Sequence, residues 1–169
     1  LIGYFLRNEP HWAMGNNNPA FEMFRVQEFS FTKNEFVRWV MDRYPHIDSL
    51  NRAWHTGFSF FTDLFDLRLK DYPSEIALQD FRDFSAIMVR EYLEVVSSET
   101  RKQAPHHLNL GMRYAYISSD LLYEASDLFD VFSVNGYHFP DPPDTREIYE
   151  RTGKPVLIGE FHFGALDRG

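Results

Sequence analysis

The sequence PVLIGEF, residues 155–161, begins as a short apolar run and stops at a glycine and a carboxylate. Apolar runs of this length, bounded by Gly, Pro, Asn or Asp, are typical of buried β-strands. The strand itself is predicted at Pro155–Ile158, and three other runs share its character: Ile2–Leu6, Leu108–Tyr116 and Leu128–Val134. Because these runs are almost continuously apolar, they favour a parallel sheet that is covered on both faces.

Helical patterns separate the four predicted strands. Caps, apolar residues at a 3.6-residue period and stops at Pro or Gly mark them. The helices are predicted from a capping box at Thr32–Glu35, over Ser49–Trp54 after a cap at Asp48, over Leu78–Gln103, at Leu121–Ala125, and over Thr145–Thr152 before Gly153. Strands that alternate with helices in this way are typical of an α/β fold with a parallel sheet.

The composition is that of a globular protein, with 169 residues, 44% of them hydrophobic and 25% charged. The formal net charge of −8 argues against a nucleic-acid partner, which needs a basic surface. Cysteine is absent, which excludes disulfides, thiolate catalysis and cysteine metal sites. No run of about 18 apolar residues is present, so no membrane span is predicted. Neither a metal nor a cofactor is predicted.

Both ends of the sequence, at Leu1 and Gly169, lie in or close to apolar runs. Domains usually begin and end in polar, exposed segments. We therefore expect residues 1–169 to be an internal piece of a larger protein, without a second domain.

Polar and ionisable residues gather at the ends of the predicted strands or directly after them. In chain order they are Asn8 and Glu9, then Arg113, then Asn135, Tyr137 and His138, and finally Glu160 and His162. In α/β barrels and open α/β sheets, active sites are built at the carboxyl ends of the strands. Two carboxylates in unlike surroundings, one protonated and one ionised, are what glycoside hydrolysis requires. Glu9 and Glu160 therefore indicate a glycosidase site.

Several of these residues also have a purely structural interpretation. Glu9 and Glu160 could be ordinary strand-terminal acids, and Asn8 could be a turn former. Trp12 could pack in the core as well as stack on a sugar. Arg113 and Tyr137 could be rim residues.

A metal site is a further alternative from the residues alone. His11, His138 and His162 each lie within three residues of Glu9, Tyr137 or Glu160 in the sequence. A His/Glu set of this kind could hold a divalent ion. The spacing matches no HExxH-type motif, so this alternative is the weaker one.

Four segments resemble the clan A glycoside hydrolases. NEP at residues 8–10 resembles their acid/base strand, and GEF at residues 159–161 resembles their nucleophile strand. LNRAWHTGF at residues 50–58 resembles a segment of the β-galactosidase-like and β-agarase-like members, families forty-two and fifty. VFSVNGY at residues 131–137 resembles the sixth strand of the clan. The resemblance spans essentially the whole chain.

The resemblance implies a partial (β/α)8 TIM barrel, in which residues 1–169 are an incomplete catalytic barrel running from its fourth strand to just past its seventh. It implies Glu9 as the acid/base and Glu160 as the nucleophile of a retaining enzyme, whose two carboxyl groups lie about 5–5.5 Å apart. Asn8 would contact the sugar 2-hydroxyl, and Tyr137 would hydrogen-bond the nucleophile and help to keep it ionised.

The implied partner is a carbohydrate substrate, with β-galactosides and agarose-type β-linked galactans favoured. Trp12 is the expected stacking platform for the sugar, and the further candidate contacts are Arg113, Asn135, His138 and His162. A non-catalytic carbohydrate-binding barrel is the alternative. The exact sugar, exo or endo action, the oligomeric state and the compartment stay open. Because half a barrel leaves two sheet edges open, the isolated segment is expected to be poorly stable and inactive.

Overall fold

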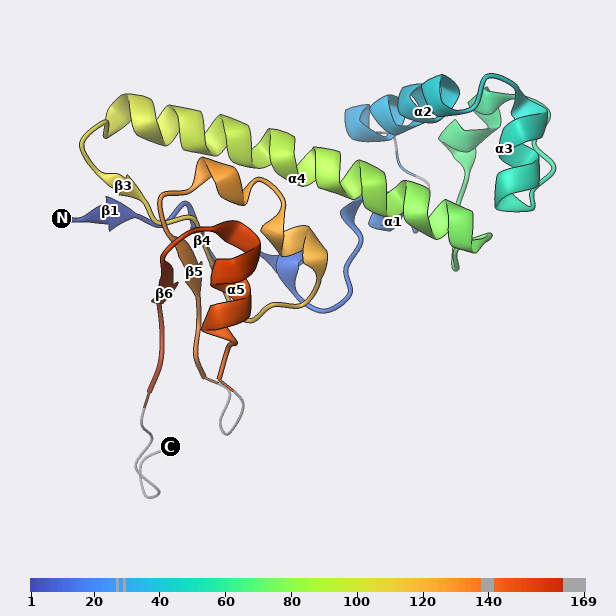
Figure 1. Ribbon diagram of the computed structural model, residues 1–169. Helices are drawn as coiled ribbons and strands as arrows, with labels where there is room; N and C mark the ends of the chain where they lie inside the picture. The colour runs from blue at the N-terminus through green and yellow to red at the C-terminus, as the bar shows by residue number, and fades with distance from the viewer. Residues whose placement is uncertain (27, 29, 138–141, 163–169) are drawn as a thin grey trace. The chain divides into compact units, whose positions relative to one another are not determined.

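The computed structural model describes residues 1–26, 28, 30–137 and 142–162 (Figure 1). Contacts within the chain divide it into two compact units. One unit consists of Leu1–Asn16 and the chain from Val89 onward, and the strands of the described residues lie in it. The other unit, Asn17–Met88, is helical. The prediction that residues 1–169 form one incomplete barrel domain stays a prediction.

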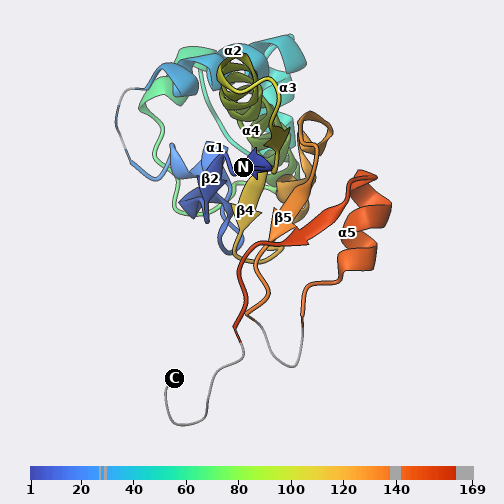
Figure 2. The same ribbon diagram turned by 90° about the vertical axis from the view of Figure 1, so that its left-hand side faces the viewer.

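Short parallel strands form the sheets of the first unit. They are β1 (Gly3–Tyr4), β2 (Arg7–Asn8), β3 (Leu108–Asn109), β4 (Met112–Tyr114), β5 (Phe132–Val134) and β6 (Val156–Ile158). The order is β1-β3 in one sheet and β2-β4-β5-β6 in the other (Figure 2). Each predicted apolar run therefore lies beside the next run along the chain, as in a (β/α)8 barrel. The predicted α/β fold with part of a barrel is confirmed.

The first two predicted strands are each interrupted, which the apolar pattern did not indicate. Gly111 separates β3 from β4 and has φ +72°, a left-handed conformation that favours glycine. A Cβ there would lie 2.8 Å from Cδ2 of Phe129. The pairing continues through the break, because the Leu6 N–H donates to the Gly111 carbonyl oxygen at 3.0 Å. The first run also extends further than predicted, so that β2 ends at Asn8.

The predicted helices are present, with shifts at several starts. The helices are α1 (Pro19–Glu22), α2 (Phe31–Arg43), α3 (Ile47–Trp54), α4 (Glu75–Gln103) and α5 (Thr145–Thr152), with 3₁₀ turns η1 (His11–Ala13), η2 (Phe61–Asp66), η3 (Asp120–Tyr123) and η4 (Ser126–Leu128). Of these, α1 and the turns η1, η2 and η4 were not predicted. α4 starts before the predicted Leu78, and η3 starts before the predicted Leu121. α5 has the predicted bounds and ends at Gly153, which has φ +65° and donates to the Tyr149 carbonyl oxygen at 2.8 Å.

Two predicted helix caps are wrong. Ser30 caps α2 in place of Thr32, because the Ser30 hydroxyl accepts from the Lys33 N–H at 3.0 Å. α3 begins at Ile47, one residue before the predicted cap Asp48. Several polar residues with capping side chains stand near each start, and the local backbone, set by tertiary packing, selects among them.

The core of the strand-containing unit surrounds β4 and β5. It contains Ala13, Val89, Leu93, Met112, Tyr114, Leu122, Ala125, Phe129, Phe132, Val134 and Ile148. β5 is buried on both faces, as predicted for a central parallel strand. β6 is an edge strand, and the side chain of its Leu157 is 37% exposed. The sheet is therefore not covered on both faces at β6, in contrast to the prediction. In the described part of the chain, no helix is long and apolar enough to cross a bilayer.

The segment at residues 50–58 closes the end of α3 in the helical unit. The Asn51 side chain donates from Nδ2 to the Phe58 carbonyl oxygen at 2.8 Å and accepts at Oδ1 from the Phe58 N–H at 2.9 Å. Oδ1 also accepts from the Thr56 hydroxyl at 3.0 Å. His55, between them, has φ +57°. The asparagine therefore holds a tight turn, and the motif builds the fold of this unit.

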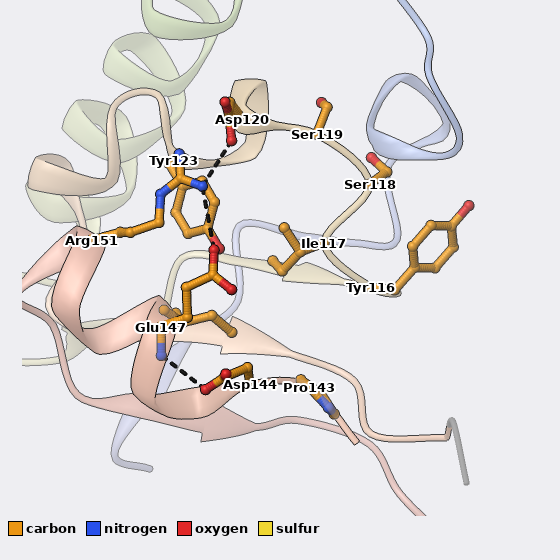
Figure 3. A pocket seen from close by; sticks show the side chains of 11 residues that line it. Tyr116, Ile117, Ser118, Ser119, Asp120, Tyr123, Pro143, Asp144, Glu147 and Arg151 are labelled. Carbon is orange, nitrogen blue, oxygen red and sulfur yellow. Dashed lines mark hydrogen bonds and ion pairs between the residues drawn. The ribbon is translucent and has the colours of Figure 1, made fainter. Parts of the chain in front are cut away.

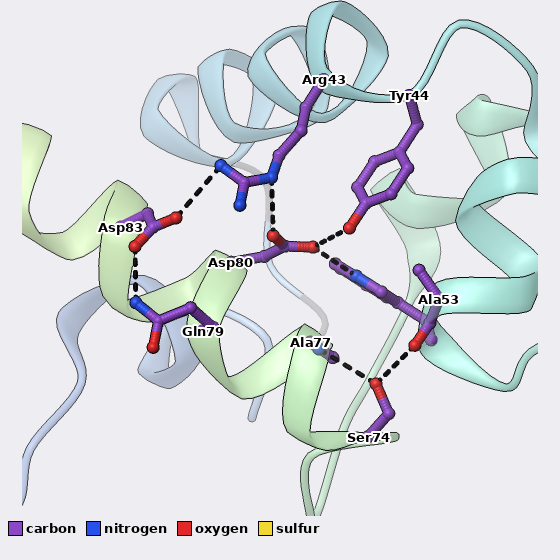
Figure 4. A network of polar contacts seen from close by, with 9 residues as sticks. Arg43, Tyr44, Ala53, Ser74, Ala77, Gln79, Asp80 and Asp83 are labelled. Atoms are coloured by element: carbon purple, nitrogen blue, oxygen red, sulfur yellow. Dashed lines mark hydrogen bonds and ion pairs between the residues drawn. The ribbon is translucent and has the colours of Figure 1, made fainter.

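A buried acid, Asp80, ties α4 to α2 and α3 (Figure 4). Its Oδ2 accepts from the Tyr44 hydroxyl at 2.6 Å and from Nε1 of Trp54 at 2.7 Å. Its Oδ1 pairs with Nε of Arg43 at 2.9 Å. Burial, with the hydrogen bond to Asp80, raises the pKa of Tyr44 to about 12, so this phenol stays a donor throughout the neutral range.

Replacement of Asp80 by alanine is expected to destabilise the helical unit by about 3 kcal/mol or more, since it leaves the Tyr44 and Trp54 donors without their acceptor and removes one ion-pair partner of Arg43. Asp83→Ala is the matched control. Asp83 pairs with the same Arg43 at 3.0 Å, but its side chain is 33% exposed, so its loss is expected to cost less than about 1 kcal/mol. Urea unfolding of the full-length protein, followed by tryptophan fluorescence, measures both. Equal losses would contradict the role given to Asp80.

Candidate active site

The backbone of the first carboxylate, Glu9, is held in an unusual conformation. Glu9 follows directly after β2, and its φ of +41° lies in the left-handed region, which is strained for a side chain of this size. Its N–H donates to the Arg113 carbonyl oxygen at 2.9 Å, which extends the pairing of β2 with β4 by one step. This hydrogen bond and the adjoining Pro10 fix the direction in which the Glu9 side chain leaves the sheet.

The second carboxylate, Glu160, lies after β6 and binds a donor with each oxygen. Its Oε1 pairs with a guanidinium nitrogen of Arg113 at 2.7 Å. Its Oε2 accepts from the Tyr137 hydroxyl at 2.8 Å. The side chains of Arg113 and Glu160 are each 24% exposed, so the ion pair is partly shielded from water while remaining open to a ligand.

Arg113 connects Asn8, at the end of β2, with Glu160, which follows β6. Its Nε donates to Oδ1 of Asn8 at 2.8 Å, and its guanidinium lies 4.8 Å from the ring centroid of Phe5. Its aliphatic stem crosses directly over Gly159, where a Cβ would lie 2.5 Å from Cδ of Arg113. Any larger residue before Glu160 would displace Arg113, which explains the glycine of the GEF segment.

Asn135 contacts the first carboxylate, that of Glu9. It follows β5, is completely buried, and its N–H donates to the Tyr114 carbonyl oxygen at 2.7 Å. Its side-chain Nδ2 donates to Oε1 of Glu9 at 2.6 Å. The next residue, Gly136, donates to the Glu160 carbonyl oxygen at 2.7 Å, so backbone bonds on both sides hold this segment.

Tyr137 is kept as a proton donor by its partner. The hydrogen bond to Glu160, together with partial burial and the charges of Glu160 and Glu9, raises the pKa of Tyr137 above the ordinary value of a phenol. The nearby Arg113 opposes this shift. The phenol therefore remains protonated, and able to donate to Glu160, across the neutral range.

Six of the predicted site residues thus form two sets of side-chain contacts, one of Asn8, Arg113, Glu160 and Tyr137 and one of Glu9 and Asn135. The backbone bond from the Glu9 N–H to the Arg113 carbonyl oxygen joins the two sets. His162 lies beside the first set, with its ring centroid 5.4 Å from that of Tyr137. His138 lies outside the described residues. The predicted roles of all these residues in binding a substrate stay predictions.

Trp12 lies in η1 and belongs in part to the core. It is half-buried, packs against the core cluster of the first unit, and meets the Tyr114 ring edge-on at 6.2 Å. Its role as a sugar platform stays a prediction. Gly159 was not predicted as a site residue, although it leaves the space that the stem of Arg113 occupies. Its position between an apolar strand and a carboxylate was the available signal.

A separate cavity of about 420 Å³ lies between the turn after β4 and helix α5 (Figure 3). Arg151 extends across one wall, where it pairs with Asp120 at 2.8 Å and Glu147 at 3.6 Å and lies over the Tyr123 ring at 3.8 Å. A further acid of the wall, Asp144, accepts from backbone N–H groups of the first turn of α5. Arg151 therefore holds α5 to the turn, whereas Glu147 and Asp144 make these contacts within α5 and at its start.

No group of three or more histidine, aspartate and glutamate side chains that could hold a metal ion occurs within residues 1–26, 28, 30–137 and 142–162. One of the three histidines of the metal alternative, His138, falls outside these ranges. The arrangement that the structure does describe is a pair of carboxylates, one with an amide donor and the other with a guanidinium and a phenol.

Comparisons with known proteins agree with the resemblance seen in the sequence. The chain is 28% identical over its whole length to β-agarase B of Vibrio sp. (strain JT0107), and 28% identical to β-agarase A of the same strain. It spans 19% of the length of each. No family model matches the sequence.

Solved structures give the same result. The chain is similar to part of the crystal structure of an agarase, with a TM-score of 0.84 and 31% identity over 99% of this chain and 25% of that one. It is similar to an exo-β-agarase with a TM-score of 0.83 and 27% identity, over 99% of this chain and 24% of the other. The likeness to β-agarases is thus confirmed in sequence and in fold, for a segment of those larger proteins.

Proposed function

We propose that this chain carries the acid/base and the nucleophile of a retaining glycoside hydrolase that cleaves agarose-type β-linked galactans. The observation that carries the proposal is the difference between the two carboxylates. Glu160 accepts from Arg113 and from Tyr137, whereas the described contact of the Glu9 carboxylate is one neutral amide, from Asn135. Donors of this kind stabilise an ionised carboxylate, which is the form that a nucleophile needs.

In the proposed mechanism, Glu160 attacks the anomeric carbon while Glu9 protonates the departing glycosidic oxygen. The bond between the sugar and the leaving group breaks as the bond to a Glu160 oxygen forms. Glu9, now ionised, then takes a proton from water, and the water oxygen displaces Glu160 from the sugar. Arg113 and Tyr137 hold Glu160 in place through both displacements.

The substrate class follows from the relatives, which are named β-agarases. Agarose is a neutral galactan, and the net charge of −8 is compatible with a neutral polymer and unfavourable for a strongly anionic one. The proposed partner is therefore an uncharged β-linked galactan chain.

Proton NMR of the first products released from agarose oligosaccharides by the full-length protein tests this proposal. A retaining enzyme is expected to release the β-anomer first, before mutarotation mixes the anomers. Initial release of the α-anomer would contradict the retaining mechanism. Binding without any hydrolysis would favour a non-catalytic carbohydrate-binding barrel, and activity that is abolished by EDTA and restored by a divalent ion would favour the metal alternative.

A further inference from the structure

The contact between Asn135 and Glu9 has a consequence for the path of the proton. Asn135 donates from Nδ2 to Oε1 of Glu9, and the distance of 2.6 Å is short for a neutral donor. The N–H takes one of the two lone-pair positions of Oε1 and stabilises negative charge there, so the proton of the acid is more stable on the other oxygen. The contact therefore favours Oε2 as the oxygen that carries the proton of the Glu9 acid.

The surroundings make this contact rigid. Asn135 is completely buried, and its backbone is bonded to β4 through the Tyr114 carbonyl oxygen. Glu9 is held at φ +41° by its own bond to the Arg113 carbonyl oxygen. The backbone N–H groups of both residues are therefore bonded to β4, which holds the amide donor and the carboxylate beside each other.

We infer that Asn135 is a positioning residue that selects Oε2 of Glu9 as the oxygen through which both catalytic proton transfers pass. This inference rests on the proposed function. In the first step, Oε2 gives its proton to the glycosidic oxygen as the bond from that oxygen to the anomeric carbon breaks. In the second step, Oε2 receives a proton from the attacking water, and the bond between the sugar and Glu160 breaks. Oε1 accepts from Asn135 throughout.

Substrates whose leaving groups differ in their need for a proton distinguish the positioning role of Asn135 from a purely structural role. A 2,4-dinitrophenolate departs without protonation, whereas phenolate or a sugar alkoxide needs the acid. In the full-length protein, Asn135→Ala is expected to lower kcat/KM about 10- to 100-fold on a phenyl glycoside of a galactan oligosaccharide. On the 2,4-dinitrophenyl glycoside of the same oligosaccharide, the loss is expected to stay below about 3-fold. The ratio of the two losses does not depend on the folded fraction.

Asn109→Ala is the matched control. Asn109, the last residue of β3, is also a buried asparagine of the same unit, but its side chain bonds to Ser97, Leu128 and Gly111, away from the carboxylates. Its replacement is expected to lower the thermal midpoint and to leave the ratio between the two substrates unchanged. Asn135→Ser, which leaves a smaller gap, serves as a second variant.

The outcomes are distinct. A loss confined to the phenyl glycoside in both Asn135 variants supports the inference. Equal losses on both substrates, as for Asn109→Ala, overturn it, and the proposed function then stands on the behaviour of Glu9 and Glu160. Failure of the unsubstituted protein to cleave either substrate overturns the proposed function, and the inference fails with its premise.

Discussion

The Glu160→Ala variant of the full-length protein is expected to lose at least about 10⁴-fold in kcat on galactan oligosaccharides, because it lacks the group that forms the covalent intermediate. The smaller side chain leaves a space beside Arg113 and Tyr137 that a small anion can enter. Added azide is therefore expected to restore turnover of an activated aryl glycoside. Azide would attack the anomeric carbon directly, so the glycosyl azide should have the inverted configuration, which NMR of the product shows.

Glu150→Ala provides the control for this experiment. Glu150 lies on α5 with a side chain that is 59% exposed and paired with Arg146 on the surface. Its loss is expected to leave kcat within about 2-fold, as for most surface substitutions. Activity of Glu160→Ala within 10-fold of the unsubstituted protein would show that this carboxylate is structural. A glycosyl azide of retained configuration would exclude Glu160 as the nucleophile.

The Glu9→Ala variant is expected to behave differently, because it lacks the proton donor and keeps the nucleophile. On an oligosaccharide or phenyl glycoside, kcat/KM is expected to fall by about 10²- to 10⁴-fold. On a 2,4-dinitrophenyl glycoside, the first step needs no acid, so the glycosyl-enzyme is expected to form rapidly and accumulate. Burst kinetics with this substrate measure that accumulation.

Azide gives Glu9→Ala a second readout. It attacks the glycosyl-enzyme on Glu160 after one inversion has already occurred, so the azide product is expected to have the retained configuration. The opposite stereochemistry of the two variants assigns one role to each carboxylate. An inverted azide from Glu9→Ala, or equal losses on all leaving groups, would contradict the assignment of Glu9 as the acid/base.

Much of this protein could be predicted from local patterns. The four apolar runs, the bounds of α5 and the glycine at its end follow from residues a few positions apart, since a strand needs an apolar run and a helix end needs a residue that accepts positive φ. The same patterns place Glu9 and Glu160 at the carboxyl ends of strands, and parallel strands bring those ends to one edge. The similarity to β-agarases was also visible in a short segment, LNRAWHTGF at residues 50–58.

The partners of the site residues were decided by the tertiary structure. Asn135 and Glu9 are 126 residues apart, and Arg113 and Asn8 are 105 apart. Local propensity carries no information on such pairs, because they depend on which strands neighbour each other and in which register. From the sequence, Arg113 and Asn135 were therefore expected as sugar contacts, with a rim position as the alternative for Arg113. In the structure, pairing of β2, β4, β5 and β6 carries Arg113 to Glu160 and the Asn135 amide to Glu9.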